Sequence, residues 1–301
     1  VGMEATFPAL WFERMLAEFS HELWVGDAAE IRARAVRAQK TDTRDAEPLL
    51  SLLLTDRFPR LWVPSPAERD LRQLLVHRNK VVRMRTAVKN QLPAMALSQG
   101  LCRRGKLWSA RGQTELKGLG LLPWASRRRQ ELLGMLGQLD GSIGELDQAV
   151  EAAARSRAEV VLLQTHPGVG PVVGLAFVLT RGPVERFPHS KRVVSYLGLN
   201  PREHSSGGRQ RLGAISQQGN PMMRGLRVEA AQTAARFDPE WRRSYQRLKL
   251  RRASGVAKVA MARKLAVRLY WMLRSQTDYA HRVRMSGSPS SGGVDRGPST
   301  D

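Results

Sequence analysis

The sequence predicts an α/β domain at the amino-terminal end, followed by a longer and mainly helical region. Over residues 1–66, short apolar runs alternate with helical patterns, and this alternation is typical of layered α/β domains. From Pro66 the apolar residues recur at helical spacing over long stretches. The chain has 301 residues and a hydrophobic content of 42%, which is enough for two folded domains with a real core.

Residues 1–66 are predicted to contain three strands and three helices. The strands are expected at Val1–Ala5, Glu22–Gly26 and Arg60–Pro64. The helices are expected at Ala9–Phe19, Ala28–Arg37 and Thr43–Leu54. Because the first strand begins at the first residue, which is not a methionine, we expect the sequence to start partway into a domain. A start codon other than the usual one is the alternative.

Residues 67–159 are predicted to form an antiparallel helical hairpin. One face of its first helix is apolar but interrupted by Arg78 and Arg85, and carries Leu71, Leu74, Val81, Val88 and Leu92. The second helix has the alternating spacings of four and three that define a coiled-coil heptad, at Leu132, Leu136, Leu139, Ile143, Leu146 and Val150. A helix of an ordinary bundle is the alternative. A connector rich in glycine and arginine, Gly100–Arg129, joins the two helices.

Residues 160–276 are predicted to form a second, mainly helical domain. Asn220 is a good helix N-cap and Pro221 suits the first helical position, so a helix is expected from there to about Arg236. Two more helices are expected at Pro239–Arg251 and Val256–Arg274. The tail, residues 277–301, is rich in serine, glycine and proline, a composition typical of disorder.

The charge balance favours a nucleic-acid partner. There are 49 Lys and Arg against 27 Asp and Glu, a net charge of +22. Cations set against phosphates release condensed counterions, so an excess of this size favours binding to a polyanion. Cys102 is the only cysteine, which excludes an intramolecular disulfide and a multi-cysteine zinc site and fits a reducing cytoplasm. No apolar run is long enough to cross a bilayer.

Two segments are candidates for binding nucleic-acid phosphates. "HPGVG" between two predicted helices resembles a helix-hairpin-helix turn, in which Gly168 and Gly170 let the backbone approach a phosphate; a plain turn is the alternative. The basic connector would hold phosphates through Arg103, Arg104, Lys106, Arg127, Arg128 and Arg129.

Three carboxylates are candidate metal ligands. Glu4 follows an apolar strand, and Asp42 and Asp45 lie three residues apart, on one face of a helix. A Mg²⁺ ion held between their oxygens would remove the repulsion between the two aspartates. The alternative is that Asp42 caps the helix and Asp45 lies in its first turn, where the helix dipole favours negative charge.

The segment "HSSGGRQR" has the composition that a serine nucleophile needs. Its two glycines let the backbone expose a hydroxyl, and Arg209, Arg211 and Arg224 could neutralise charge that develops on a phosphoryl group. Most such segments are polar turns, which is the alternative.

Together these pieces resemble the IS-one-ten (IS110) family of insertion-sequence transposases. The resemblance spans about residues 1–275 and rests on "MEAT", "KTDTRDA", "HPGVGPVVG", "RFPHSKRVVSYLGLNPREHSSGG" and "ISQQGNPMMRGLRVEAA". It implies a RuvC-like (RNase H fold) domain with a DEDD carboxylate set, a coiled-coil insertion and a C-terminal transposase domain with a nucleophilic serine. Members are DNA recombinases, and those studied are guided by a structured RNA and assemble as multimers on donor and target DNA.

Carried over to this sequence, the resemblance assigns Glu4, Asp42 and Asp45 as ligands of Mg²⁺ and Ser206 as the nucleophile, with Ser205 as the alternative. It implies a bacterial cytoplasmic, nucleoid-associated homo-oligomer that acts on element ends and target DNA. The family's first Asp lies upstream of the Glu, and nothing precedes Val1 here. This absence keeps open a second interpretation, an inactive transposase fragment that binds nucleic acid. A metal-dependent nuclease of the Holliday-junction type, in which Ser206 has only a structural role, is the other alternative.

Overall fold

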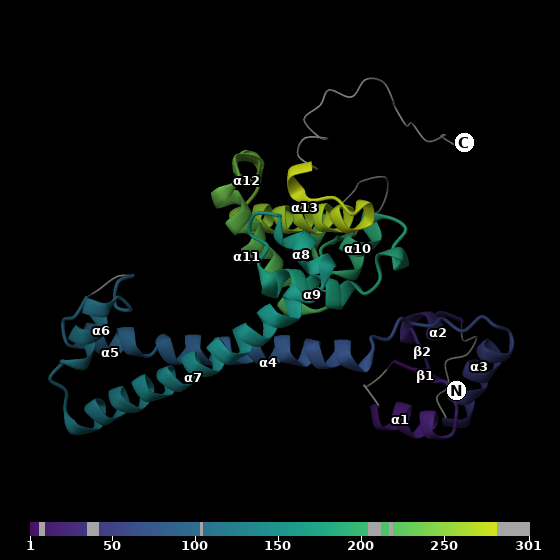
Figure 1. Cartoon of the computed structure of the whole chain (residues 1–301), viewed down its shortest axis with the longest axis horizontal. Helices are drawn as coiled ribbons and strands as arrows, with labels where there is room; N and C mark the ends of the chain where they lie inside the picture. Colours follow the sequence, from purple (N-terminus) through teal and green to yellow (C-terminus); the bar gives the residue numbers. More distant parts are fainter. Residues whose placement is uncertain (6–9, 35–41, 103–104, 204–211, 217–218, 282–301) are drawn as a thin grey trace. The chain divides into compact units, whose positions relative to one another are not determined.

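The structure, a computed structural model, describes residues 1–5, 10–34, 42–102, 105–203, 212–216 and 219–281. The chain divides into two compact units, Val1–Pro66 and Ala67–Asp301. Figure 1 shows the elements of both units coloured along the chain. Helices dominate the described residues and the strands are short, as expected for a small α/β part and a mainly helical remainder.

In its described residues, the amino-terminal unit has a pair of short strands and three helices. They are β1 (Gly2–Glu4), α1 (Leu10–Glu18), β2 (Trp24–Gly26), α2 (Ala28–Arg34) and α3 (Asp42–Leu54). The strands are parallel, with Met3 opposite Val25. Parallel strands need a crossover connection, and α1 lies in that connection. The β–α–β order therefore follows the prediction.

The third predicted strand, Arg60–Pro64, is the main difference in this unit. The structure has only an isolated antiparallel bridge between Arg60 and Gly26, with the Leu61 N–H donating to the carbonyl of Val25 at 2.7 Å. Pro59 and Pro64 flank this contact, and proline has no N–H to extend a ladder. The apolar run is therefore correctly placed beside β2, but the prediction of a full strand was wrong.

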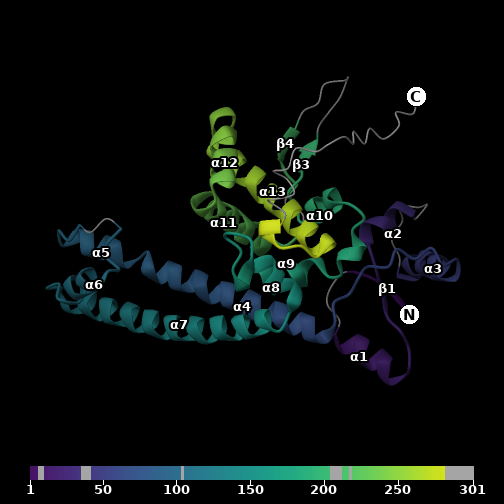
Figure 2. The same cartoon turned by 45° about the horizontal axis from the view of Figure 1, so that its top comes forward.

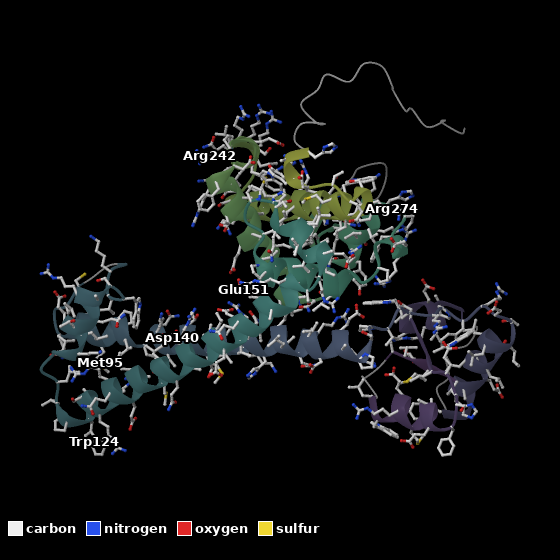
Figure 3. All side chains as sticks on the ribbon, viewed as in Figure 1. Met95, Trp124, Asp140, Glu151, Arg242 and Arg274 are labelled. Atoms are coloured by element: carbon white, nitrogen blue, oxygen red, sulfur yellow. The ribbon has the colours of Figure 1, made fainter. Side chains whose placement is uncertain are left out.

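The larger unit begins with two long antiparallel helices, α4 (Pro66–Lys89) and α7 (Pro123–Arg155). Arg78 pairs with Asp147, and Arg85, one heptad later, pairs with Asp140, one heptad earlier, at 3.1 Å. Partner positions that move in opposite directions along the chain require antiparallel helices. The two arginines that interrupt the apolar face of α4 thus form interhelical ion pairs, and Figure 3 labels Asp140 along α7.

The connector between these helices is a folded cap, which the sequence analysis did not predict. It contains α5 (Leu92–Ser98) and α6 (Ala110–Lys117). The cap has its own cluster of buried residues, shared with the nearby ends of the long helices: Leu92, Ala96, Leu107, Leu116, Leu132 and Leu136. Ser109 caps α6 by accepting a hydrogen bond from the Gly112 N–H at 3.2 Å. The end of the hairpin is therefore a small hydrophobic unit of its own.

The C-terminal domain packs helices around α13, which carries a long row of buried residues. Its helices are α8 (Ala158–Gln164), α9 (Pro171–Arg181), the 3₁₀ helix η1 (Val184–Arg186), α10 (Ser190–Tyr196), α11 (Pro221–Phe237), α12 (Pro239–Arg251) and α13 (Ser254–Ser275). The three predicted helices of this region are present within two residues at each end. Leu75 and Val150 belong to the same core, so the base of the hairpin packs into this domain.

The folded domain continues past the boundary predicted at residue 276. Tyr279 is buried, its hydroxyl donates to Asp238 at 2.6 Å, and its N–H donates to the Thr165 hydroxyl at 3.1 Å. The first residues of the predicted tail are thus part of the core, and residues 282–301 lie outside the described residues. No helix in the described part of the chain has the length and apolar character to cross a membrane.

Candidate functional site

The segment with the candidate nucleophile joins two paired strands. β3 (Pro201–Glu203) and β4 (Leu212–Ile215) form an antiparallel ribbon, with Pro201 opposite Ile215 and Glu203 opposite Leu212. Figure 2 shows the ribbon beside α10 and α13. Residues 204–211 connect the two strands, so both ends of this segment are anchored by the strand pairing.

The residues of the connecting segment themselves lie outside the described residues. They include His204, Ser205, Ser206, Arg209 and Arg211. The base of the ribbon is secured on both sides, because the Ser216 N–H donates to the Asn200 carbonyl at 2.8 Å and Arg202 donates to the Ser216 carbonyl at 3.3 Å. The candidate serines are therefore located by their position in the chain, between two fixed strand ends.

The start of α11 follows closely after the ribbon. Asn220 caps α11, and its side-chain oxygen accepts hydrogen bonds from the N–H groups of Met222 at 2.9 Å and Met223 at 3.4 Å. Gly219, just before it, has a φ of +79°, and a Cβ there would lie 2.7 Å from the Tyr196 carbonyl oxygen. Only glycine allows this turn to pass so close to α10, so the predicted cap at Asn220 is confirmed together with a fixed entry angle for α11.

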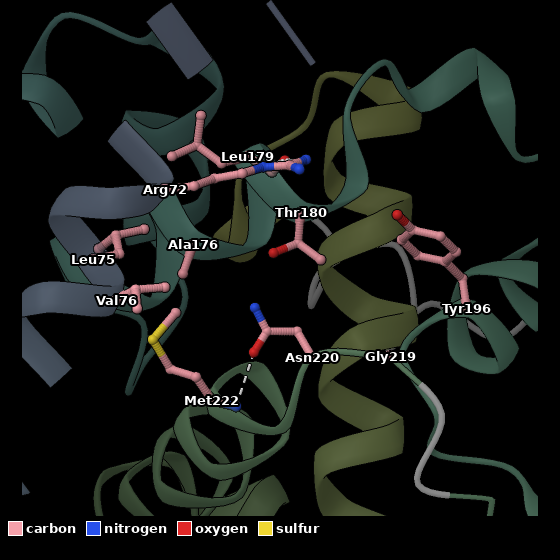
Figure 4. A pocket seen from close by; sticks show the side chains of 10 residues that line it. All are labelled: Arg72, Leu75, Val76, Ala176, Leu179, Thr180, Tyr196, Gly219, Asn220 and Met222. Atoms are coloured by element: carbon pink, nitrogen blue, oxygen red, sulfur yellow. Dashed lines mark hydrogen bonds between the residues drawn. The ribbon is translucent and has the colours of Figure 1, made fainter. Parts of the chain in front are cut away.

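A cavity of about 320 Å³ opens at this turn, between the base of α4, α9 and the start of α11. Figure 4 shows Asn220 and Thr180 facing the hollow, with Arg72 above them and Tyr196 to the side. Arg72 donates to the Leu179 carbonyl at 3.0 Å, and burial lowers the pKa of its guanidinium. The cavity therefore combines an apolar wall with a fixed cation and amide and hydroxyl groups.

Three more cations of the same domain lie near the turn or in the domain core. Arg224 donates to the Gly219 carbonyl at 3.0 Å, so its guanidinium lies at the turn before α11. Arg227 is fully buried and donates to the Met223 carbonyl at 2.9 Å; burial lowers its pKa to about 9. Arg181 is also fully buried and pairs with Glu159 at 2.9 Å. The sequence gives no signal that separates these buried arginines from surface ones.

In the amino-terminal unit, Glu4 lies at the end of β1, opposite Gly26. Its carboxylate pairs with Arg32 of α2 at 3.4 Å and is about one-third exposed. At the end of the neighbouring strand, Asp27 caps α2 by accepting from the N–H groups of Ala29 at 2.8 Å and Glu30 at 3.1 Å. The carboxyl ends of both parallel strands therefore carry an acidic side chain, and the sequence analysis found only the first.

Asp42 and Asp45 occupy the first turn of α3, as predicted. The side chains of both aspartates lie outside the described residues, so their distance from Glu4 is not part of the geometry. α3 packs on β1, because Leu53 lies beside Gly2. Within the described ranges, no group of three or more His, Cys, Asp and Glu side chains could hold a metal ion.

The predicted helix-hairpin-helix turn lies between α8 and α9, with its two glycines in different environments. Gly168 has a φ of +82°, and a Cβ there would lie 2.4 Å from the Ala230 carbonyl oxygen and 2.7 Å from the Ala234 nitrogen. Gly168 therefore packs tightly on α11 of its own domain. Gly170 caps α9, is exposed, and has no atom within 4 Å of its Cβ position. Of the two, Gly170 is the one accessible to a phosphate.

The predicted basic connector separates into surface and interior residues. Lys106 and Arg128 are exposed, Arg127 pairs with Glu131 at 2.9 Å, and Arg103 and Arg104 lie outside the described residues. Arg129 is buried, and its guanidinium donates to the Leu119 carbonyl at 2.7 Å and to the Leu116 carbonyl at 3.2 Å. Arg129 thus joins α7 to the end of α6, a structural role that the sequence analysis did not foresee.

The comparisons with known proteins match both units. Residues 160–246 match a family model described as "Transposase IS116/IS110/IS902 family". Residues 23–99 match a DEDD transposase model of the IS110 type, described as "Transposase". The two models cover separate parts of the chain in the order that the resemblance implied.

The chain contains two domains of IS116/IS110/IS902 family transposases.

Relatives over most of the chain agree with this family. A probable family 20 transposase of Pseudomonas aeruginosa is 28% identical over 93% of this chain and 85% of its own length. The transposase for insertion sequence element IS1111A of Coxiella burnetii is 27% identical over 81% of this chain and 69% of its own length. The transposase for insertion sequence element IS1328 of Yersinia enterocolitica is 26% identical over 92% of this chain and 84% of its own length.

The transposase models cover most of the candidate residues. The model that matches residues 23–99 includes Asp42 and Asp45, and Glu4 lies before its first matched residue. The model that matches residues 160–246 includes the turn at Gly168, the segment with Ser206 and the start of α11. The ribbon and the turn at Gly168 therefore fall within the C-terminal region shared with other insertion-sequence transposases, and the cavity combines residues of this region with Arg72, Leu75 and Val76 of α4.

Proposed function

We propose that this transposase cuts and rejoins DNA strands at insertion-sequence ends, with Ser206 as the nucleophile. The observation that carries the proposal is the placement of Ser206 in the segment between β3 and β4, whose ends are held together by strand pairing. A hydroxyl on a short anchored connection can be presented to a DNA phosphate without rearrangement of the domain around it. The start of α11, which follows β4 in the chain, supports this, since a helix N-terminus favours a negatively charged group.

The proposed reaction is a phosphoryl transfer with a covalent intermediate. The Ser206 hydroxyl gives up its proton, and its oxygen forms a bond to phosphorus. The bond from phosphorus to the 3′ oxygen breaks, and that oxygen leaves as a 3′-hydroxyl. A 3′-hydroxyl of a partner strand later attacks the phosphoserine, which restores the serine hydroxyl and joins the strands. Arg209, Arg211 and Arg224 would neutralise the charge on the phosphoryl oxygens in both steps.

The carboxylates of the amino-terminal unit are proposed to hold Mg²⁺. Glu4, Asp42 and Asp45 form a donor set of hard oxygen ligands, which is the kind that Mg²⁺ prefers. Glu4 is accessible at the end of β1 and is paired with Arg32, so a metal ion would compete with that arginine. A bound ion would polarise a phosphodiester or activate a nucleophile. With this assignment we also propose that residues 1–66 have an RNase H-like fold.

DNA and a structured guide RNA are the proposed partners. The net charge of +22 favours binding to polyanions. Groups that can contact phosphates are exposed on the hairpin cap and on the C-terminal domain. The proposed phosphate contacts are Lys106, Arg127 and Arg128, with Arg103 and Arg104, and the exposed Gly170 at the start of α9. Gly168 and Arg129 are left out because both are engaged inside the protein. Donor and target ends must meet during the reaction, so we propose that the chain acts as a homo-oligomer.

The test is a search for the covalent intermediate. The full chain is incubated with an element-end duplex labelled at the 3′ end of the cleaved strand, with the element's RNA and Mg²⁺, and resolved on a denaturing gel. Labelled DNA should migrate with the protein for the wild type and for Ser205→Ala. It should not do so for Ser206→Ala, and Glu4→Gln should reduce the amount.

Each other outcome has a defined meaning. Loss of the adduct in Ser205→Ala alone would make Ser205 the nucleophile. Cleavage without an adduct in wild type and variants would identify a metal-dependent nuclease. Binding of the duplex without cleavage by the wild type under these conditions would identify an inactive nucleic-acid-binding protein and contradict the proposal.

A further inference from the structure

Helix α12 has two faces of opposite character. Its inner face packs against the domain through four residues at helical spacing, namely Trp241, Ser244, Tyr245 and Leu248. Its outer face is exposed and consists of Arg242, Arg243, Gln246, Arg247, Lys249, Leu250 and Arg251. Figure 3 shows nitrogen-bearing side chains gathered around this helix, where Arg242 is labelled. The sequence analysis predicted the helix but assigned no role to this face.

The positive charge of the outer face is not neutralised within the described part of the chain. Glu240, the only acidic residue of α12, points to α13, where it pairs with Lys264 at 3.3 Å and Arg268 at 3.8 Å. No ion pair joins Arg243, Arg247, Lys249 or Arg251 to another described residue, and Arg242 donates to the backbone carbonyls of Ala235 and Arg236. Several like charges on one short helix repel each other, so an external polyanion would stabilise this arrangement.

The outer cations flank a different central strip. At 3.6 residues per turn, Gln246 and Leu250 lie along the middle of the exposed face. Arg243, Arg247 and Arg251 lie on one side of this strip, and Arg242 and Lys249 lie on the other. Leu250 is 88% exposed. The centre of the face therefore offers an amide and an apolar side chain between two rows of cations.

The helix is also held firmly in place. Trp241 is completely buried, and its backbone N–H donates to the Asp238 carboxylate at 3.0 Å. The other oxygen of Asp238 accepts from the Tyr279 hydroxyl at 2.6 Å. A helix fixed at its N-terminal end presents its outer side chains without a further loss of backbone conformational entropy on binding.

We propose that α12 enters the major groove of duplex DNA, an inference that rests on the proposed function and names its DNA contact. A helix with its side chains is about 10–12 Å across, and the major groove of B-form DNA is about 12 Å wide. The two rows of cations face the phosphates on both sides of the groove, and Gln246 and Leu250 face the base edges. An amide pairs with adenine and an apolar side chain contacts the thymine methyl. The narrow major groove of A-form RNA does not admit a helix.

The test measures binding alone, so its failure is separate from failure of the covalent chemistry. Fluorescence anisotropy of the full chain carrying Ser206→Ala is measured on an element-end DNA duplex, from low to high salt. The double variant Arg243→Gln/Arg247→Gln should weaken binding at least about ten-fold and reduce the magnitude of the salt slope by about two, one unit for each lost phosphate contact. The melting temperature should stay unchanged because both side chains face solvent.

The matched control removes two exposed arginines elsewhere in the same unit. Arg111 and Arg155 are exposed, and each forms an ion pair within its own helix, with Glu115 and Glu151. Arg111→Gln/Arg155→Gln lowers the net charge by the same amount and should leave the salt slope near that of the parent chain. Equal loss in the two double variants would show that only total charge matters and would overturn the proposal.

Two further measurements test the groove and the type of nucleic acid. Gln246→Ala/Leu250→Ala should reduce the preference for the element end over a scrambled duplex while leaving the salt slope in place. A duplex whose major groove is filled by glucosylated hydroxymethylcytosine should bind the parent chain as weakly as the unmodified duplex binds Arg243→Gln/Arg247→Gln. Unchanged binding of the filled duplex, or a larger loss for double-stranded RNA than for DNA in Arg243→Gln/Arg247→Gln, would overturn the proposal.

Discussion

Gly168 shows how one residue sets the packing of the C-terminal domain. The sequence analysis related it to phosphate binding, because a glycine lets the backbone approach a ligand closely. In the structure the close approach is to the chain itself, since the Cβ position lies 2.4 Å from the Ala230 carbonyl oxygen. The same physical property, absence of a side chain, thus serves the contact between the α8–α9 turn and α11.

The two glycines of this turn should respond differently to substitution. Gly168→Ala places a methyl group against rigid backbone and keeps an unfavourable positive φ, so the free energy of unfolding should fall by at least about 2 kcal/mol. Gly170→Ala has open space and a φ of −92°, and should change it by no more than about 1 kcal/mol. Urea denaturation followed by circular dichroism measures both. Equal losses would contradict the packing described for Gly168.

His166 adds a pH dependence to the same turn. It is buried, its ring lies 4.4 Å from the Tyr279 ring and 5.0 Å from the Trp241 ring, and its Nδ1 is 2.7 Å from the Pro167 carbonyl oxygen. Burial lowers the pKa of His166 to about 4 from its ordinary value of 6.5. The folded state therefore favours the neutral ring.

The free energy of unfolding should consequently fall as the pH falls from 6.5 to about 4. In this window the unfolded chain takes up a proton on His166 and the folded chain does not, which corresponds to a loss of about 3 kcal/mol. Above pH 6.5 this contribution is complete and constant. Unfolding curves for the wild type and His166→Phe across pH 4–7 measure the effect. The variant should lack this part of the slope, and parallel curves would show that other groups cause it.

At this scale the sequence predicted local chemistry well and burial poorly. Asn220 was identified as a cap because the capping signal is contained in neighbouring residues. Arg129, Arg181 and Arg227 were not identified as interior residues, because burial of a cation depends on carbonyl groups and carboxylates contributed by distant parts of the chain. The candidate site divides in the same way, since the position of Ser206 between two strands follows from the fold and not from its neighbours.

Among the elements, the two long helices were the easiest to predict and the cap was the hardest. α4 and α7 extend over several heptads, so their periodic pattern is long enough to be unambiguous. α5 and α6 have only 7 and 8 residues and are separated by Gly100 and Gly105, both with positive φ. Short helices interrupted by glycine give little periodic signal, and the connector therefore looked like a linker.

The ion pairs between α4 and α7 should depend on register more than on charge alone. Asp147→Arg places a second cation against Arg78 and should destabilise the hairpin by about 1 kcal/mol or more. Adding Arg78→Asp restores an opposite-charge pair in the same register and should recover most of the loss. The coupling is measured by thermal unfolding of the two single variants and the double variant. No recovery in the double variant would contradict the register.

A control for that cycle lies on the solvent side of α7. Glu151 and Arg155 pair at 2.5 Å within one helix, and neither contacts α4 through this pair. The reversal Glu151→Arg/Arg155→Glu should leave the melting temperature nearly unchanged, because exposed pairs within a helix contribute only about 0.3–0.5 kcal/mol.

For the whole molecule, the two units have separate cores. The amino-terminal core contains Leu16, Ile31 and Phe58, while every buried residue of the main cluster comes from Leu75 or later in the chain. The sequence analysis placed the change of architecture at Pro66, and the compact units also divide there. This agreement arises because strands and helices have different periodicities, and the change of period is visible in one sequence.

A fragment of residues 67–281 should therefore fold without the amino-terminal unit. We expect a cooperative thermal transition at a temperature close to that of the corresponding transition in the full chain, measured by circular dichroism and calorimetry. The fragment should also retain the effect of Arg243→Gln/Arg247→Gln on DNA binding, since α12 lies within it. A fragment without a cooperative transition would show that residues 1–66 are required for the C-terminal core.

The spacing of the two interhelical ion pairs has a consequence for the length of the hairpin. Arg78 and Arg85 are one heptad apart, as are Asp140 and Asp147, so each arm of the hairpin contains one equivalent heptad. Removal of a heptad from only one arm would shift every facing residue. Removal of one heptad from both arms would preserve the contacts at the base of the hairpin and at the cap. Hairpins shortened or lengthened by whole heptads in both arms would therefore differ in length while keeping the contacts at the base and the cap.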